Sequence, residues 1–348
     1  MSKKVFVGMS GGVDSSVTAA LLKEQGYDVT GVYMKNWSQD LPGMHCPWKE
    51  DYQDAKRVAV HLGIPFKLYD FETEYRQLVV DYMVHEYQAG RTPNPDIMCN
   101  QEVKFGIFLR AALADGADMI ATGHYARVQD GQLLTAQNVE KDQTYFLYRV
   151  TEDALHHSLM PIGEFKTKAE VRALAKKFGL ATADKKDSQG ICFVGKVGIK
   201  DFLLYELGEQ PHGAIIDEQC MVVGEHDGAL FYTIGQRHGL NVGGGLPYYV
   251  TGKNVVKNEV YVTRDLQDKS LWSNELTLTA LHWINSQPEA GKSYQTRSRY
   301  RAPIVRGVVQ IKGDKALLKL EEDVRAITPG QSAVIYDGER VVGGGIVI

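Results

Sequence analysis

The chain has 348 residues, more than a single hydrophobic core usually serves, so its length predicts two or three domains. The composition is that of an ordinary soluble globular protein, no apolar stretch is long enough to span a membrane, and the start Met-Ser-Lys-Lys is unlike a signal peptide. The formal net charge of −4 excludes a general attraction to nucleic acid, so a polyanion would need a local basic patch. The four widely spaced cysteines form neither a disulfide framework nor a Cys-x-x-Cys zinc pair, which favours a cytoplasmic protein with reduced thiols.

The first two hundred residues alternate between strand and helix patterns. Buried strands are expected at residues 4–9, 28–34, 66–71 and 117–122. Amphipathic helices are expected at 14–25, 49–62, 72–89 and 102–115, each followed by a glycine stop, and another helix at about 167–178. This alternation predicts an α/β fold, a doubly wound domain with a mostly parallel sheet, over residues 1–208. In such domains ligands bind beyond the carboxyl ends of the strands.

After about residue 208 the helical periodicity ends and short β segments follow. Segments at 213–217, 229–234 and 259–263 predict a small β-rich central domain over residues 209–272. Short alternating strands are then expected at 276–281, 294–301, 305–311, 315–320, 332–336 and 341–348. They predict a small β-barrel or sandwich over residues 273–348.

The first strand runs directly into Ser-Gly-Gly-Val-Asp-Ser-Ser at residues 10–16, and a helix follows. This turn aims backbone N–H groups and a helix N-terminus at one point, which suits a phosphate. A Walker A loop would end in Gly-Lys-Ser/Thr, and the missing lysine argues against ordinary γ-phosphate transfer. The loop resembles the pyrophosphate loop of enzymes that split ATP into AMP and pyrophosphate to activate a carbonyl oxygen. The alternative is a glycine turn without a ligand. Asp14 could help hold Mg²⁺ on the phosphates, although the sequence does not single it out.

Two cysteines stand in segments rich in proline, glycine, asparagine and aspartate. Cys99 follows Pro93-Asn94-Pro95-Asp96, just before the helix expected to begin near Glu102, where the helix dipole would favour a thiolate. Cys192 lies downstream of two lysines, Lys185 and Lys186, which would also favour a thiolate. Taken alone, either cysteine would more often be an inert small apolar residue.

Taken together in an ATP-activating fold, the two cysteines suggest sulfur chemistry, in which one thiol carries a persulfide and the other resolves it. Cys46 and Cys220 are interpreted as bystanders. An alternative is that Cys46 completes a three-thiolate iron–sulfur site with Cys99 and Cys192, although nothing in the spacing resembles a cluster motif.

Residues 292–306 contain five basic side chains and no acid. On a strand, Arg297, Arg299 and Arg301 would share one face and Tyr300 would project from the other. Such a stripe suits contacts with phosphates, which fix the register of a nucleic acid without reading its sequence. The alternative is a solvated strand face.

These motifs carry a resemblance to the tRNA-specific 2-thiouridylase family, MnmA, and the match runs nearly from end to end. The similar segments are 8–16, 89–100, 121–125, 141–147, 187–193, 235–237, 328–333 and 343–345. Several ATP pyrophosphatases share the pyrophosphate loop, whereas the Pro-Asn-Pro-Asp-x-x-Cys and Asp-Ser-x-Gly-Ile-Cys-Phe blocks are far more specific.

The resemblance implies that ATP adenylates O2 of the wobble uridine of certain tRNAs, and that a persulfide sulfur replaces this oxygen. It implies that Cys192 bears the persulfide and that Cys99 is the nucleophile, with a transient disulfide between them at the end. The implied partners are the anticodon stem-loop of tRNA and a sulfur donor, either a cysteine desulfurase or a sulfur-relay protein.

The resemblance also assigns site residues by their positions in the family's motifs. The implied ATP contacts are Gly8, Met9, Ser10, Gly11, Gly12, Val13, Asp14, Ser15, Ser16, Met34 and Gly123. The implied contacts with the target base, which must be flipped out for such chemistry, are Asn94, Pro95 and Asp96. The implied tRNA contacts are His124, Asp142, Gln143, Thr144, Tyr300, Arg301 and Gln331.

The sequence therefore predicts an ATP-dependent tRNA uridine 2-sulfurtransferase that uses ATP with Mg²⁺. One alternative is an ATP pyrophosphatase ligase or amidotransferase acting on a small metabolite, which would need neither the two cysteines nor the arginine strand. Another is a non-catalytic tRNA-binding sulfur carrier, which would release no AMP.

Overall fold

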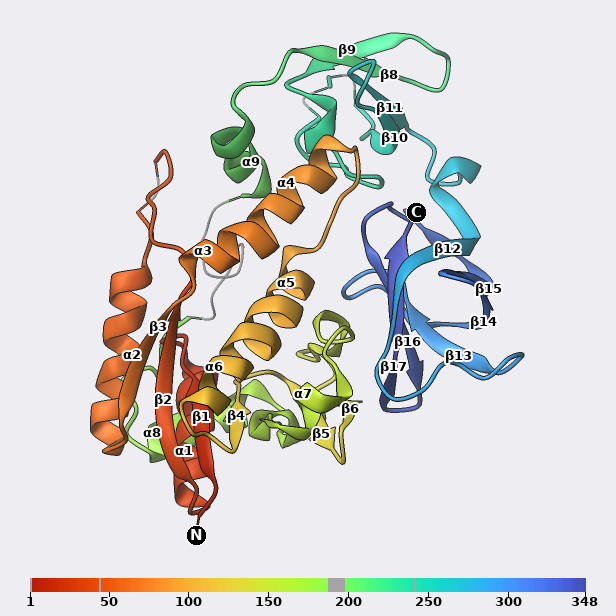
Figure 1. Ribbon diagram of the computed structural model, residues 1–348. Helices are drawn as coiled ribbons and strands as arrows, with labels where there is room; N and C mark the ends of the chain where they lie inside the picture. Colours follow the sequence, from red (N-terminus) through yellow and green to blue (C-terminus); the bar gives the residue numbers. More distant parts are fainter. Residues whose placement is uncertain (1, 44, 187–197, 241, 244) are drawn as a thin grey trace.

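The computed structural model describes residues 2–43, 45–186, 198–240, 242–243 and 245–348. Figure 1 shows three parts along the chain: an α/β part, a small central part beyond one end of α4, and a β-barrel beside the α/β part. In the described residues, no helix is both long and apolar enough to cross a membrane.

The α/β part is built on a five-stranded sheet in which every pairing is parallel. Its order is β3-β2-β1-β4-β7, with β1 (Lys4–Gly8), β2 (Asp28–Lys35), β3 (Phe66–Asp70), β4 (Met119–Ala121) and β7 (Ser158–Leu159). The chain moves outward from β1 to β2 and β3 and then returns to the other side of β1 as β4. The loop after β1 therefore lies where the strand order reverses, the usual ligand site of such sheets. The predicted doubly wound parallel sheet is confirmed.

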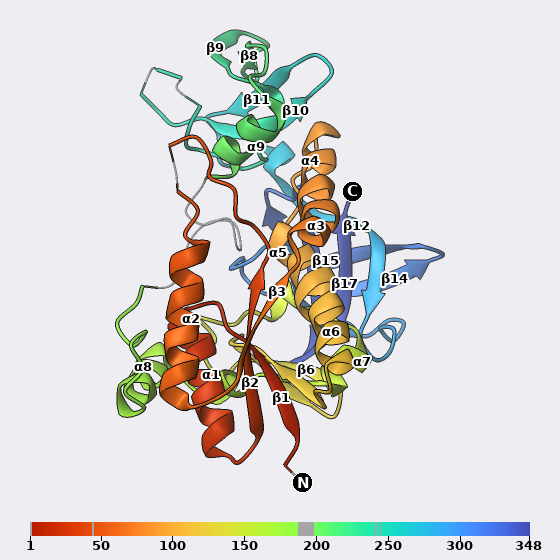
Figure 2. The same ribbon diagram turned by 60° about the vertical axis from the view of Figure 1, so that its left-hand side comes forward.

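Helices cover both faces of this sheet (Figure 2). One face carries α1 (Val13–Glu24), α2 (Trp48–Leu62) and α8 (Lys168–Lys177). The other carries α3 (Glu72–Tyr75), η1 (Arg76–Val80), α4 (Asp81–Gln88), α5 (Pro95–Met98), η2 (Cys99–Ile107) and α6 (Phe108–Ala114). Alternation along β1 explains the two layers, because Val5 and Val7 join the core under α1 and α2, whereas Phe6 joins the opposite core.

One predicted helix boundary in the α/β part is wrong. The helix expected at 102–115 begins at Pro95, since α5, η2 and α6 follow one another without a break. Asn94 caps it, because its Oδ1 accepts hydrogen bonds from the N–H groups of Asp96 and Ile97 at 3.1 and 3.4 Å. Cys99 thus lies inside the helix and not in a loop before it. Pro95 favours this start because its fixed φ suits the first helical position.

A hairpin of the α/β part extends the sheet of the barrel. It consists of β5 (Ala126–Gln129) and β6 (Gln132–Thr135), and β6 pairs with β17 at Leu134 and Arg340. The remaining short helices of this part are η3 (Thr144–Phe146), α7 (Glu152–His156) and η4 (Pro161–Glu164).

In the residues that the structure describes, the central part has one α-helix, one 3₁₀ helix and a four-stranded sheet. It contains α9 (Ile199–Leu207), β8 (Gly213–Ile216), β9 (Val222–His226), η5 (Ala229–Phe231), β10 (Tyr249–Asn254) and β11 (Glu259–Thr263). The strand expected at 229–234 is wrong, because its first three residues form the 3₁₀ turn η5. All three side chains of η5 are buried. The apolar residues at 229–231 therefore reflect a fully buried turn and not a strand with one buried face.

The third part is a closed barrel, as one of the two sequence-based alternatives predicted. After η6 (Lys269–Leu271) it contains β12 (Trp272–Trp283), β13 (Ser293–Arg297), β14 (Val305–Lys312), β15 (Lys315–Arg325), β16 (Ser332–Asp337) and β17 (Arg340–Val347). The order β12-β15-β14-β13-β16-β17 closes because β17 also pairs with β12. Its interior is packed with aliphatic side chains, among them Leu276, Leu278 and Leu318.

Candidate functional site

The loop between β1 and α1 leaves a helix N-terminus open. Gly11 adopts φ +75°, which favours glycine, and Gly12 is the N-cap of α1 without any capping side chain. The loop is held from inside, since Ser15 Oγ accepts from the N–H of Ser10 at 3.1 Å and Ser16 Oγ donates to the carbonyl of Gly12 at 2.7 Å. An uncapped helix start beside a glycine turn suits an anion such as pyrophosphate.

The other predicted ATP contacts lie against this loop. A Cβ on Gly123, which follows β4, would lie 2.6 Å from the backbone nitrogen of Ser15. A Cβ on Gly8 would lie 3.0 Å from Cε of Met34, whose side chain projects from β2. The structure therefore brings residues 8–16, Met34 and Gly123 together at the carboxyl edge of the sheet.

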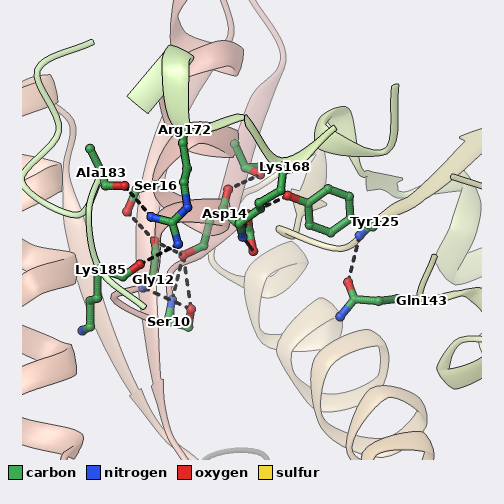
Figure 3. A network of polar contacts seen from close by, with 12 residues as sticks. Ser10, Gly12, Asp14, Ser16, Tyr125, Gln143, Lys168, Arg172, Ala183 and Lys185 are labelled. Carbon is green, nitrogen blue, oxygen red and sulfur yellow. Dashed lines mark hydrogen bonds and ion pairs between the residues drawn. The ribbon is translucent and has the colours of Figure 1, made fainter. Parts of the chain in front are cut away.

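Asp14 of this loop is held by a lysine from α8 (Figure 3). The Lys168 ammonium lies 2.7 Å from both carboxylate oxygens of Asp14, and Tyr125 donates its hydroxyl to Asp14 at 3.1 Å. The backbone N–H of Tyr125 in turn donates to Gln143 Oε1 at 2.9 Å. The Asp14 carboxylate is thus engaged by a cation. Across the described ranges, no group of three or more His, Cys, Asp or Glu side chains could hold a metal ion.

The chain that leads toward residue 187 is anchored near the same loop (Figure 3). Arg172 donates to the carbonyl oxygens of Ala183 and Lys185 at 2.6 and 2.9 Å. The Lys185 ammonium lies 2.7 Å from both Asp51 and Asp54. Burial opposes the charge of Lys185, but hydrogen bonds to these two carboxylates raise its pKa. The Lys185 ammonium is therefore occupied by ion pairs with α2. Cys192 lies outside the described residues, so its role and the predicted disulfide stay predictions.

Cys99 and the predicted base contacts belong to one helix. Asn94, Pro95 and Asp96 form its cap and first turn, and Cys99 follows as a fully buried residue. Because Cys99 lies beyond the first turn, the effect of the helix dipole expected from the sequence is weaker than predicted. The helix instead fixes the distance between Cys99 and the polar groups at its start.

The expected arginine strand is also wrong. β13 ends at Arg297, where its pairing with β16 ends. Arg299 turns inward and donates to Thr328 Oγ1 at 2.8 Å, and burial lowers the pKa of its guanidinium. Arg301 adopts φ +61° and lies over the ring of Tyr300, 5.2 Å from its centre. The residues of the stripe therefore do not share one exposed strand face, because the chain leaves the sheet before the second of the three arginines.

Three of the predicted tRNA contacts, Asp142, Tyr300 and Arg301, line a surface hollow between the α/β part and the barrel. Tyr300 and Arg301 lie there together with Arg297 and residues 139–142. Tyr300 also packs against Phe146, with ring centres 4.3 Å apart. An exposed cation beside an aromatic ring suits contact with phosphates and bases.

The predicted tRNA contacts other than Tyr300 and Arg301 have hydrogen-bond partners within the protein. His124 is buried, its Nδ1 lies 2.7 Å from Thr122 Oγ1, and burial holds its pKa well below the usual value. Asp142 accepts from the Thr144 hydroxyl at 2.7 Å, and burial raises the pKa of this carboxyl. Gln331 donates its side-chain amide to the carbonyl of Thr92 at 2.8 Å. Their direct contact with tRNA stays a prediction.

Comparison with known families gives matches over most of the chain. Family models described as a tRNA methyl transferase HUP domain, a tRNA methyl transferase PRC-barrel domain and an aminomethyltransferase beta-barrel domain match residues 3–196, 200–264 and 273–347. The tRNA-specific 2-thiouridylase MnmA of Bacillus subtilis (strain 168) is 47% identical over 352 residues, which cover 99% of this chain and 94% of the relative. That of Streptococcus sanguinis (strain SK36) is 47% identical over 355 residues, with coverage of 99% and 95%. The chain belongs to the tRNA-specific 2-thiouridylase family.

Similarity to solved structures is partial. A 4-thiouridine synthetase in complex with RNA and bound ATP is 19% identical at a TM-score of 0.38, covering 56% of this chain and 46% of that chain. The NMN synthetase from Francisella tularensis is 18% identical at a TM-score of 0.34, covering 53% and 66%.

Sequence reasoning missed two residues near the candidate site of this thiouridylase. Lys168 is one of several lysines on the helix expected at about 167–178, and no local motif connects it to Asp14. Asn36 follows β2 two residues after Met34, and its side chain is 1% exposed. Neither amide atom of Asn36 has a hydrogen-bond partner in the structure as described. The sequence around Asn36, Lys35-Asn36-Trp37-Ser38, gives no signal that this side chain is buried.

Proposed function

We propose that this thiouridylase family member is an ATP-dependent tRNA uridine 2-sulfurtransferase that thiolates the wobble uridine through a cysteine persulfide. The observation that carries the proposal is a match to named thiouridylases over 99% of the chain. The open loop after β1 and the helix that carries Cys99 support it, because they supply an anion site and a thiol in one α/β part.

In the proposed reaction, residues 8–16, Met34 and Gly123 hold ATP, and Mg²⁺ accompanies its phosphates. The open N–H groups of the first turn of α1 face the phosphates, and the Lys168 ammonium adds a positive charge beside them. ATP supplies AMP to O2 of the uracil, with release of pyrophosphate, because a ring carbonyl oxygen is otherwise a poor leaving group.

The sulfur step is proposed to use both cysteines. The terminal sulfur of a Cys192 persulfide attacks C2 of the activated uracil, and AMP leaves. The Cys99 thiolate then attacks the Cys192 sulfur, which breaks the sulfur–sulfur bond, leaves one sulfur on C2 and forms a Cys99–Cys192 disulfide. A thiol reductant must reopen this disulfide, and a cysteine desulfurase or sulfur-relay protein must reload the persulfide. Asn94, Pro95 and Asp96 are proposed to contact the flipped-out base.

The anticodon stem-loop of tRNA is proposed to bind beside Tyr300 and Arg301. The hollow that these residues line is open and carries a guanidinium over an aromatic ring. His124, Asp142, Gln143, Thr144 and Gln331 are proposed to support this interface.

We also propose the division of the chain into domains at residues 1–208, 209–272 and 273–348. We further propose a cytoplasmic location, where tRNA and desulfurases meet.

The test is a reconstitution with defined components. Unmodified tRNA transcript, ATP with Mg²⁺, a cysteine desulfurase and ³⁵S-cysteine are mixed with the protein, and 2-thiouridine and AMP are quantified by mass spectrometry. The wild-type protein should form both products, and Cys99→Ser or Cys192→Ser should reduce thiolation by about a thousandfold or more. Cys220→Ser is the matched control, because this exposed cysteine lies in the central part.

The outcomes separate the alternatives. AMP release that does not depend on tRNA, with full activity of both serine variants, would support a ligase acting on a small metabolite. Binding of tRNA without any AMP release would support a non-catalytic sulfur carrier. Either result would overturn the proposal.

A further inference from the structure

One short segment of the α/β part contacts both other parts of the molecule. The N–H of Thr92 donates to the carbonyl of Pro329 at 2.8 Å, and the carbonyl of Thr92 accepts from Gln331 Nε2 at 2.8 Å. Both backbone polar groups of Thr92 are thus satisfied by the barrel. The Thr92 hydroxyl lies 3.3 Å from the hydroxyl of Thr233, which belongs to the central part. Thr92 is buried, so water does not compete for these bonds.

The barrel side of this contact is a fixed turn. Gly330 adopts φ +93°, and a Cβ there would lie 2.7 Å from the nitrogen of Thr92, so the two backbones touch without an intervening side chain. Gly330 donates its N–H to Val347 at 2.9 Å, and Val347 donates to the carbonyl of Gln331 at 2.8 Å. The turn is therefore tied to the last strand of the barrel and moves with it.

The other side of the contact leads directly to Cys99. Arg91 is paired with Glu86 of α4, with Nε donating to Oε2 at 2.6 Å. Pro93 and Pro95 restrict the backbone on both sides of the helix cap Asn94. The path from Thr92 to Cys99 is thus a proline-stiffened link followed by one capped helical turn. A shift of Thr92 is transmitted along this path because few torsions can absorb it.

We infer that Thr92, Gly330 and Gln331 are positioning residues through which the barrel sets the location of the helix that carries Cys99. This contact would keep the Cys99 thiol at a fixed position relative to tRNA bound on the barrel. That consequence for catalysis rests on the proposed function. On this view Gln331 acts on the Cys99 helix through Thr92, to whose carbonyl its amide nitrogen donates.

The first test does not depend on thiolation. Alkylation rates of Cys99 and Cys46 by iodoacetamide are measured by peptide mass spectrometry in the full-length protein without tRNA. Cys46 is equally buried and serves as the internal reference for global unfolding. Gln331→Met should raise the rate at Cys99 about tenfold and leave Cys46 unchanged, because the partly buried hydrogen bond from Gln331 to Thr92 is lost. Gln310→Met is the matched control, since Gln310 is exposed on β14 of the same barrel. Unchanged alkylation at Cys99, or an equal rise at both cysteines, would overturn the inference.

The second test separates positioning from RNA contact. In single-turnover thiolation, Gln331→Met should lower the rate about tenfold while the Kd for tRNA stays within twofold of the wild-type value. Gly330→Ala should also lower the thiolation rate and leave the Kd for tRNA unchanged, although neither glycine nor alanine has a side-chain polar group that could contact RNA. Weaker tRNA binding with wild-type alkylation of Cys99 would make Gln331 a direct RNA contact and overturn the inference. A wild-type protein that thiolates no tRNA would overturn the proposed function. The alkylation rates would still show whether Gln331 positions the helix that carries Cys99.

Discussion

Lys168 and Asp14 form an ion pair across 154 positions of sequence, with the ammonium 2.7 Å from both carboxylate oxygens. The loop at residues 10–16 contains no lysine. Helix α8 supplies a cation to this loop from a distant part of the chain, which local motif reading cannot detect.

Replacing Lys168 should weaken ATP binding and slow AMP release. Lys168→Met is expected to raise the Kd for ATP and lower tRNA-dependent AMP release by about ten- to a hundredfold, since a charged hydrogen bond contributes about 1.5–3 kcal/mol. Calorimetry gives the Kd, and chromatography of labelled nucleotides gives AMP. Lys177→Met is the matched control, because Lys177 lies on the same helix but pairs with Glu24 at the surface. Equal ATP affinity in both variants would show that Lys168 only balances the charge of Asp14.

Arg301 and Arg299 should respond differently to removal of their charge. Arg301→Ala is expected to weaken tRNA binding and to reduce the slope of log K against log salt by about 0.9, the contribution of one phosphate contact. Arg299→Met is expected to leave that slope unchanged and to lower the melting temperature, because Arg299 bonds internally to Thr328. Filter binding over a salt series and thermal unfolding measure the two effects. A reduced salt slope in Arg299→Met would contradict this assignment.

Buried His124 should make the protein less stable in mild acid. Its pKa in the folded state lies well below the usual value because of burial, so between that pKa and about 6.5 the unfolded chain binds the additional proton. Stability should therefore fall as the pH drops below about 6.5. The contribution of His124 is the part of this fall that disappears in His124→Asn, whose amide can replace Nδ1 toward Thr122. Denaturant unfolding at a series of pH values from 7.5 to 5 provides the measurement. If the free energy of unfolding falls equally with pH in the wild type and in His124→Asn, a group other than His124 is responsible.

Replacing Asn36 by leucine should stabilise the protein. Both amide atoms of Asn36 are buried without partners within the described residues, and an apolar side chain of similar size removes that desolvation penalty, about 1–3 kcal/mol. Asn100→Leu is the matched control with the opposite sign, because Asn100 Nδ2 donates to the carbonyl of Phe146 at 3.0 Å. Thermal unfolding without ligands compares the two variants. A loss of stability in Asn36→Leu as large as that in Asn100→Leu would mean that the Asn36 amide is satisfied in solution.

The predicted elements were most accurate where a glycine stop or a turn marks the boundary. Helix α2 ends at Leu62 before Gly63 in the left-handed conformation, as the sequence predicts. The start of the Cys99 helix was missed although Asn94 and Pro95 are a good cap and first residue. The second proline and the polar residues around it favoured a loop, and only packing decided that this segment is helical.

The sequence by itself determined the parallel sheet, the glycine turn after β1 and most of the barrel strands, because these follow from the periodicity of apolar residues and from local turn residues. The resemblance to the family came from its motifs. The tertiary structure decided that Lys168 reaches Asp14, that Arg299 is internal while Arg301 lines a hollow, and that Gln331 holds Thr92. These contacts join residues far apart in sequence, and their geometry is set by how the sheet, its helices and the barrel pack together.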